Sequence, residues 1–173
     1  FPKHGTGDAT ADQGFSGGGH GNKDAHDITL TGSVPGVEGL SLGVGYAKAK
    51  YDGAAANENE REEGTAYVKY AYGPLTVGWQ RGAVGLAGSN PYSYKNTYIG
   101  ISYAVSDDLS ISYNTIDSSR SGEYSVAQDF DSISLSYSMG GMTIGIADAD
   151  CSNCSYTANR KQDETTVSLS VAF

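Results

Sequence analysis

The sequence predicts an all-β fold, a transmembrane antiparallel up-and-down β-barrel of which nine strands are visible. Apolar residues recur at every second position in short segments along most of the chain, which is the period of a half-buried strand. Short turns and long polar loops alternate between these segments, as they do in barrels inserted from one side of a membrane. The last segment ends on an aromatic residue, Phe173, and such an edge is protected when the last strand of a barrel pairs with the first.

Composition agrees with strands and turns. The chain has 173 residues, 24 of them Gly and 13 of them Tyr, and only 38% are hydrophobic. That fraction suits a barrel wall, because only every second strand residue faces lipid. A run of about 18 apolar residues, which a membrane-spanning helix requires, is absent. The net charge of -9 argues against nucleic acid as a partner and would favour cations inside a pore.

The chain is expected to divide into two regions. Residues 1–23 are rich in Gly and lack alternation, so they are predicted to be an external loop or a flexible segment. Residues 24–173 are predicted to hold the barrel strands. The expected strands are 28–34, 40–47, 66–72, 75–80, 98–105, 109–115, 132–139, 142–147 and 165–173.

Each strand in turn pairs an apolar face with a face of small residues. In the first four strands, the second face consists mainly of Thr, Ser, Gly and Ala. The apolar faces of these strands are Ile28 and Leu30, then Leu40, Leu42, Val44 and Tyr46, then Ala66, Val68, Tyr70 and Tyr72, then Leu75, Val77 and Trp79. Strands with these two faces fit a sheet that has lipid on one side and water on the other.

The last five strands repeat the pattern, and serine becomes the dominant residue of the second face. In 132–139, four serines alternate with Ile133, Leu135, Tyr137 and Met139. The apolar faces of the other strands are Ile99, Ile101, Tyr103 and Val105, then Leu109, Ile111 and Tyr113, then Met142, Ile144 and Ile146, then Val167, Leu169, Val171 and Phe173. Small polar residues cannot fill a narrow barrel, so they indicate a wide, wet lumen.

The connections between strands fall into two classes. Short turns are expected near residues 36, 73, 107 and 140, and long polar loops over 52–64, 81–93, 117–128 and 148–162. The aromatic residues follow the same division and predict two girdles at the membrane interfaces. Tyr46, Trp79, Tyr113 and also Tyr94 are expected near the long loops, and Tyr72, Tyr103 and Tyr137 near the short turns.

The motifs together resemble a known family. They are G-V-E-G-L-S-L-G-V-G-Y (36–46), Y-V-K-Y-A-Y-G-P-L-T-V-G-W (67–79), Y-I-G-I-S-Y-A-V-S-D-D-L-S-I-S-Y (98–113) and V-S-L-S-V-A-F (167–173). The chain resembles the C-terminal half of a Gram-negative trimeric general-diffusion porin of the alphaproteobacterial, Rhodobacter-like type. A porin of this type has about sixteen strands, so the resemblance implies that the front half and the constriction residues lie outside this sequence.

The resemblance also implies a function and a set of partners. We expect a homotrimer in the bacterial outer membrane, with water-filled channels for the passive diffusion of small hydrophilic solutes and ions. The lipid bilayer, lipopolysaccharide and the barrel-assembly machinery are the expected partners. The machinery would recognise the closing strand, through Val167, Leu169, Val171 and Phe173.

Diffusion needs a polar wall rather than a catalytic site, so no enzymatic activity and no required cofactor are expected. Lys69, Gln80 and Asn114 share the small-residue face and are predicted to line the pore. A small outer-membrane barrel without a channel, serving as an anchor or in adhesion, is an alternative. A soluble β-sandwich binding module is another.

Two further clusters are candidate sites. Cys151 and Cys154 are expected to form a disulfide in an oxidising compartment, with two free thiols as the alternative. Four glutamates of one predicted loop are a candidate calcium site, because calcium binds converging carboxylates. They are Glu58, Glu60, Glu62 and Glu63. The acidic loops could equally bind lipopolysaccharide through divalent ions, or simply keep the surface soluble.

Overall fold

The computed structural model describes residues 22–51, 59–87, 92–121 and 126–171. These residues form nine β-strands and one short 3-10 turn. The strands are β1 (Asn22–Ser33), β2 (Leu40–Tyr51), β3 (Asn59–Tyr72), β4 (Leu75–Ala87), β5 (Tyr92–Ala104), β6 (Leu109–Arg120), β7 (Gln128–Met139), β8 (Met142–Ser152) and β9 (Lys161–Val171), and the 3-10 turn η1 is Cys154–Tyr156. Residues 1–21, most of the predicted N-terminal loop, lie outside the described part.

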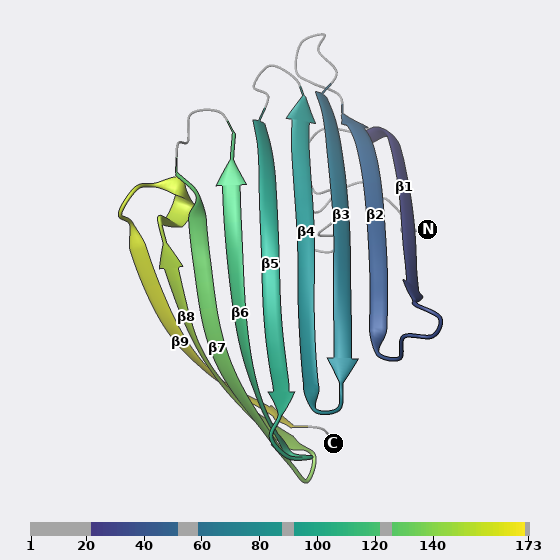
Figure 1. Cartoon of the computed structure of the whole chain (residues 1–173). Helices are drawn as coiled ribbons and strands as arrows, with labels where there is room; N and C mark the ends of the chain where they lie inside the picture. The colour runs from purple at the N-terminus through teal and green to yellow at the C-terminus, as the bar shows by residue number, and fades with distance from the viewer. Residues whose placement is uncertain (1–21, 52–58, 88–91, 122–125, 172–173) are drawn as a thin grey trace.

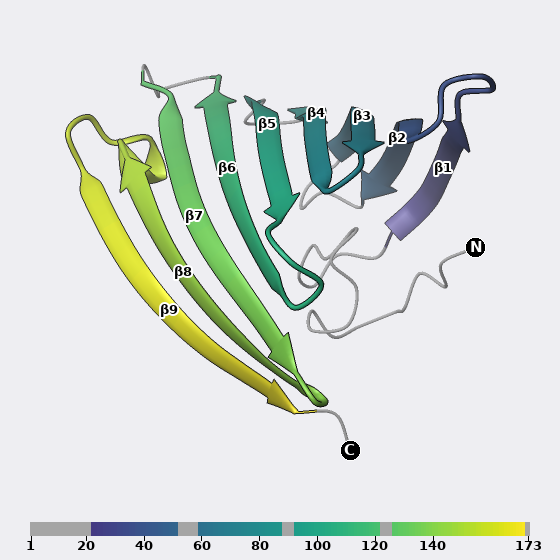
Figure 2. The ribbon, with the colours of Figure 1, turned by 60° about the horizontal axis from the view of Figure 1, so that its bottom comes forward.

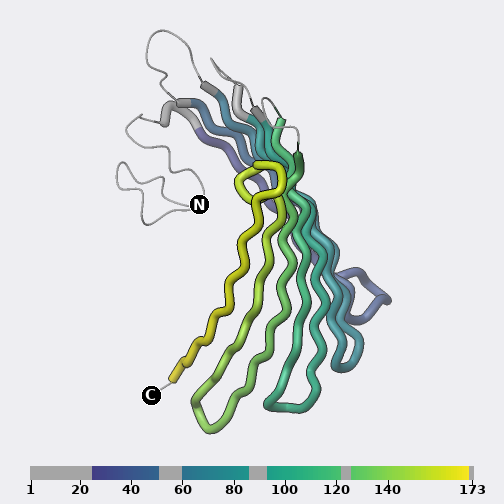
Figure 3. Tube along the Cα trace, turned by 90° about the vertical axis from the view of Figure 1, so that its left-hand side faces the viewer, coloured from purple at the N-terminus to yellow at the C-terminus, as the bar shows by residue number. Residues whose placement is uncertain are grey.

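All nine strands belong to one antiparallel sheet, and each strand pairs with its neighbours in the sequence (Figure 1). The order is β1-β2-β3-β4-β5-β6-β7-β8-β9, so the predicted all-β, up-and-down architecture and the strand count are confirmed. The sheet is a single curved layer, as Figures 2 and 3 show. Within the described residues, β1 and β9 each pair on one side only.

The sheet has two different ends. At the hairpin end the connections are short, and Gly140 and Gly141 join β7 to β8 with φ angles of 56° and 85°. Two successive residues with positive φ make a tight turn whose twist matches that of the flanking strands. The opposite end, which we call the loop end, carries the connections near residues 52–58, 88–91, 121–127 and 153–160.

The strands are longer at the loop end than the sequence predicts. β3 begins at Asn59 and β4 continues to Ala87, although the sequence predicts polar loops over 52–64 and 81–93. Similarly, β6 reaches Arg120 and β8 reaches Ser152. Polar residues stay in the ladder because its main-chain hydrogen bonds do not depend on apolar side chains. The predicted loops are therefore too long, and the sheet extends past its apolar part.

The sheet encloses little of its own surface. Among the described residues other than glycine, only Ala49, Ser118, Cys151 and Cys154 are buried. Large apolar side chains are exposed instead, such as Leu30 at 65% and Leu169 at 65%. No helix in the described ranges is long and apolar enough to cross a membrane.

Candidate functional site

Strand register places nearly all of the large apolar side chains on one face of the sheet. Residues that lie directly opposite one another share a face, and Val68, Trp79 and Ile99 are opposite one another on β3, β4 and β5. We call this face the apolar belt. Its exposed members are Ile28, Leu30, Leu42, Val44, Tyr46, Val68, Tyr70, Tyr72, Val77, Trp79, Ile99, Ile101, Tyr103, Ile111, Tyr113, Ile133, Leu135, Tyr137, Met139, Met142, Ile144, Ile146, Val167, Leu169 and Val171. So large an exposed apolar surface indicates an apolar environment.

The six aromatic residues predicted to form girdles all lie on the apolar belt. Tyr46, Trp79 and Tyr113 are the belt residues of β2, β4 and β6 that lie farthest toward the loop end, and Tyr72, Tyr103 and Tyr137 lie near the hairpin ends of β3, β5 and β7. The ring of Tyr72 stacks on Tyr70, with centroids 6.5 Å apart. Tyr94, which the sequence also suggested for a girdle, instead lies on the opposite face, where it pairs with Arg120 and Val84.

The opposite face, which we call the polar wall, carries small and hydroxylated side chains. Glycines on this face accommodate neighbouring side chains, and a Cβ at Gly100 would lie 2.8 Å from Asn114 Oδ1. Along β7 and β8 most side chains of this face are half-buried, whereas those of the apolar belt are exposed, so the polar wall is the concave face of the curved sheet. Hydroxyl groups pair across strands, with 2.7 Å between the Oγ atoms of Ser112 and Ser134. The polar wall therefore presents hydrogen-bonding groups to the space inside the curve.

The three predicted pore-lining residues lie on the polar wall, at separate positions. Lys69 is exposed and opposite Ser41 and Gly78. Gln80 Nε2 donates a hydrogen bond to Thr65 Oγ1 at 3.2 Å, and Asn114 lies over Gly100. All three positions project into the concave side, and they do not form one cluster.

Charge is distributed unequally between the two faces. The described part of the polar wall carries three acidic and three basic residues, so its formal charges cancel. They are Asp27, Glu63 and Glu164, and Arg61, Lys69 and Arg120. Most carboxylates lie on the other face, beyond the apolar belt at the loop end. They include Asp117, Asp129, Asp131, Asp148, Asp150 and Asp163, which lie on β6 to β9. Tyr113 donates its hydroxyl to Asp131 at 2.6 Å.

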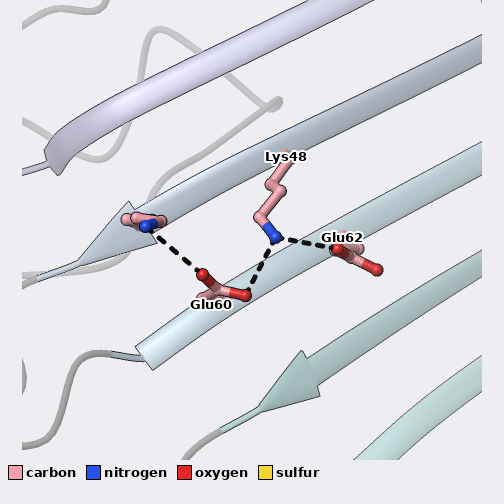
Figure 4. Close-up of polar contacts among 4 residues, drawn as sticks. Lys48, Glu60 and Glu62 are labelled. Atoms are coloured by element: carbon pink, nitrogen blue, oxygen red, sulfur yellow. Dashed lines mark hydrogen bonds and ion pairs between the residues drawn. The ribbon is translucent and has the colours of Figure 1, made fainter.

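The glutamates of the predicted calcium site do not converge. Glu60 and Glu62 lie on the face of the apolar belt, where Lys48 Nζ is 3.0 Å from Glu60 Oε2 and 3.1 Å from Glu62 Oε1 (Figure 4). Glu63 is on the polar wall, beside Arg61. A strand rather than a loop carries these residues, so successive side chains point to opposite faces. Glu58 lies outside the described residues, and no metal-binding group of three or more residues occurs within them.

Cys151 and Cys154 are joined by a disulfide at the loop end, with their Cα atoms 5.7 Å apart. Both are buried, at 6% and 2% exposure. The turn that follows folds onto the polar wall, where Tyr156 meets Ser118 and Tyr94. The sequence pattern does not predict this contact. Ile116 and Phe130 could have indicated it, because they are large apolar side chains on the polar wall, where another segment would have to cover them.

The last described strand, β9, carries Val167, Leu169 and Val171 on the apolar belt at 70%, 65% and 50% exposure. Their high exposure follows from the edge position of β9. Phe173, the expected terminal residue of the assembly signal, lies outside the described residues.

Comparison with solved structures relates the fold to outer-membrane proteins. Outer-membrane expressed OmpT of Vibrio cholerae superposes with a TM-score of 0.60 at 8% identity, covering 84% of this chain and 53% of OmpT. The trimer form of in-vitro folded OmpT gives 0.59 over the same shares. The NanC porin gives 0.51 at 11% identity, covering 89% of this chain and 96% of NanC.

The chain thus spans about half the length of the OmpT structures, 53%. No protein-family model and no curated protein matches the sequence. At these identities the likeness concerns the fold, and it agrees with the separation of apolar belt and polar wall. The chain has the antiparallel up-and-down fold of outer-membrane β-barrel proteins.

Proposed function

We propose that this chain forms part of the wall of an outer-membrane porin, a water-filled channel for passive diffusion of small hydrophilic solutes and ions. The separation of the sheet into an apolar belt and a concave polar wall supports the proposal. A membrane channel needs this division, because lipid contacts one face of each strand and water the other. Diffusion requires neither a cofactor nor a catalytic group.

The proposal includes closure of the barrel by strands additional to the nine. In the hydrocarbon core each unpaired backbone group costs several kcal/mol, and β1 and β9 each have one unpaired side within the described residues. We propose a barrel of about sixteen strands, assembled as a trimer of the general-diffusion type. The trimer form of OmpT is a fold neighbour with that assembly, and the assembly machinery would read the closing strand.

A mild preference for cations is part of the proposal and rests on the net charge of -9. The described polar wall contributes little to it, because the charges of that wall cancel. The preference would arise from long-range attraction by carboxylates at the loop end, such as Asp117 and Asp163.

The surrounding lipid is the remaining proposed partner. Arg81 and Lys95 are exposed on the face of the apolar belt, Arg81 one same-face position beyond Trp79 and Lys95 two beyond Ile99, toward the loop end. Cations at that depth are placed to bind phosphates of lipopolysaccharide head groups. Binding would anchor the loop end in the outer leaflet.

Conductance of the intact protein in planar bilayers tests the channel. We expect discrete openings, and a reversal potential in a KCl gradient with the sign of weak cation preference. Absence of conductance from folded, membrane-inserted protein would contradict the channel and favour a non-channel barrel. Protein that stays in solution without detergent would instead support a soluble sandwich.

A further inference from the structure

The turn between β8 and β9 crosses several strands on the concave side. In η1, the hydroxyl oxygen of Tyr156 is 2.8 Å from Oγ of Ser118 on β6. Its ring centroid is 5.9 Å from that of Tyr94 on β5. From β8 to β5 is three strand spacings, or about 14 Å. The turn therefore covers the polar wall at the loop end instead of continuing outward from it.

Four residues of this turn have a left-handed backbone conformation. Asn153, Ser155, Tyr156 and Asn159 have φ angles of 53°, 59°, 56° and 62°, and they are the non-Gly residues with positive φ in the described ranges. A residue with a side chain adopts this conformation at a cost, and it persists where surrounding contacts determine it.

Those contacts come from both ends of the turn and from the wall. Asn153 donates through Nδ2 to the carbonyl of Ala127 at 3.1 Å, and its Oδ1 accepts from the amide of Asn159 at 3.0 Å. Gln128 Oε1 accepts from the amide of Ser155 at 2.5 Å. The Cys151–Cys154 disulfide ties the start of the turn to β8. The turn is thus attached to β7 and β8 independently of Tyr156.

The wall beneath the turn differs from the rest of the polar wall. Ile116 and Phe130 are opposite one another there, and Phe130 is also opposite Cys151. Ser118, which binds Tyr156, is only 5% exposed and also donates to Asn96 Oδ1 at 2.5 Å. Apolar side chains on a water-facing wall are stable when another segment covers them. Ile116 and Phe130 are half-buried, and the turn meets the wall beside them through the contact of Tyr156 with Ser118.

We propose that residues 153–160 form a fixed constriction at the external mouth of the channel, with Tyr156 as its size-determining side chain. This inference rests on the proposed channel function. The disulfide and the Asn153 contacts hold the turn over the lumen, and Tyr156 fastens it to β5 and β6. Solutes that enter from the loop end would have to pass this constriction, whereas the hairpin end is free of it.

One-sided polymer exclusion, combined with hydrogen exchange, tests the proposal on the intact protein. Polyethylene glycols of increasing size are added to one side of a planar bilayer while single-channel conductance is recorded. We expect a smaller size cut-off from the loop end than from the hairpin end. The double variant Cys151→Ser/Cys154→Ser and the variant Tyr156→Ser should raise the loop-end cut-off and the conductance. Ser138→Ala, which removes a 3.0 Å contact to Thr143 at the hairpin end, is the matched control and should change neither.

Hydrogen exchange reports on the turn without requiring conduction. The amides of Cys154, Thr157 and Arg160 donate at 3.0, 3.2 and 3.2 Å, so they should be protected and lose protection in the double cysteine variant. Unprotected amides in the oxidised protein, or a loop-end cut-off that neither variant changes, would overturn the constriction. If the turn is protected but the protein does not conduct, the channel and the constriction are both wrong, and the turn is only a structural element of a closed barrel.

Discussion

The hydroxyl oxygen of Tyr156 lies 2.8 Å from Oγ of Ser118, which is 38 residues earlier in the chain. This contact connects the last loop-end turn of the sheet to β6, two strands away from β8. Ser118 also binds Asn96 on β5, so one buried hydroxyl joins three segments. Ser118 is 5% exposed and is the buried polar residue of the described part, whereas most other side chains of the polar wall are half-buried or exposed.

Lys69 and Lys95 allow a test of which face lines the channel. Lys69 lies on the polar wall and Lys95 on the face of the apolar belt, and both are exposed. Lys69→Glu should shift the reversal potential in a KCl gradient toward greater cation selectivity, because charge inside a pore acts at close range. Lys95→Glu changes the same charge outside the lumen and should shift it much less. Equal shifts would contradict the assignment of faces.

Trp79 is the single tryptophan of the chain, so its fluorescence reports on one position. A ring at head-group depth should be quenched more by a quencher attached near the lipid head group than by one at the bilayer centre. In Trp79→Phe/Val77→Trp the ring moves two residues along β4, about 7 Å along the strand, and deep quenching should become the stronger. An unchanged order of quenching would show that β4 does not cross the bilayer as proposed.

Leu135 and Ser136 are neighbours in β7 that face opposite sides of the sheet. Leu135→Arg places a charge on the apolar belt between Ile111 and Ile146, and near the bilayer midplane it should lower the free energy of unfolding by about 2–4 kcal/mol. Ser136→Arg, on the wet side, should cost clearly less. Urea titrations in lipid vesicles measure both, and equal losses would argue against lipid contact at Leu135.

Gly43 is covered by the ring of Tyr67, and a Cβ at Gly43 would overlap that ring. Gly43→Ala should therefore destabilise the sheet by about 1–3 kcal/mol, the usual cost of overpacking. At Gly78 on the same wall, the nearest atom to an added Cβ is Val68 O at 3.9 Å, so Gly78→Ala is the control. Adding Tyr67→Ala to Gly43→Ala should remove most of the penalty. If Gly43→Ala and Gly78→Ala are equally stable in urea, the packing of Tyr67 on Gly43 is wrong.

Much of the architecture could be predicted because a strand has a period of two. In 132–139 the alternation of four serines with Ile133, Leu135, Tyr137 and Met139 determines which side chains share a face. Neighbouring strands repeat the pattern. The sequence therefore predicts the number of strands, their pairing in sequence order and the two faces of the sheet. The predicted pore-lining residues Lys69, Gln80 and Asn114 lie on the expected face for this reason.

Predictions were less accurate where the pattern ends. The segment around Tyr94 lacks apolar alternation, so the sequence does not define its register and wrongly predicts Tyr94 in a girdle, whereas it lies on the polar wall. The sequence predicts Glu60, Glu62 and Glu63 in a loop, whereas they belong to β3 and lie on both of its faces. Main-chain pairing extends these strands, and side-chain hydropathy does not report it.

The sequence by itself determined the fold class, the strand order and the two faces, because these depend on residue alternation and on local turn chemistry. Only the tertiary structure decided where the strands end, how Lys48 pairs with Glu60 and Glu62, and where the Cys151–Cys154 turn folds. Contacts of this second kind join residues that are distant in the chain, such as Tyr156 and Ser118. They depend on register and curvature, and neither is encoded in a single segment.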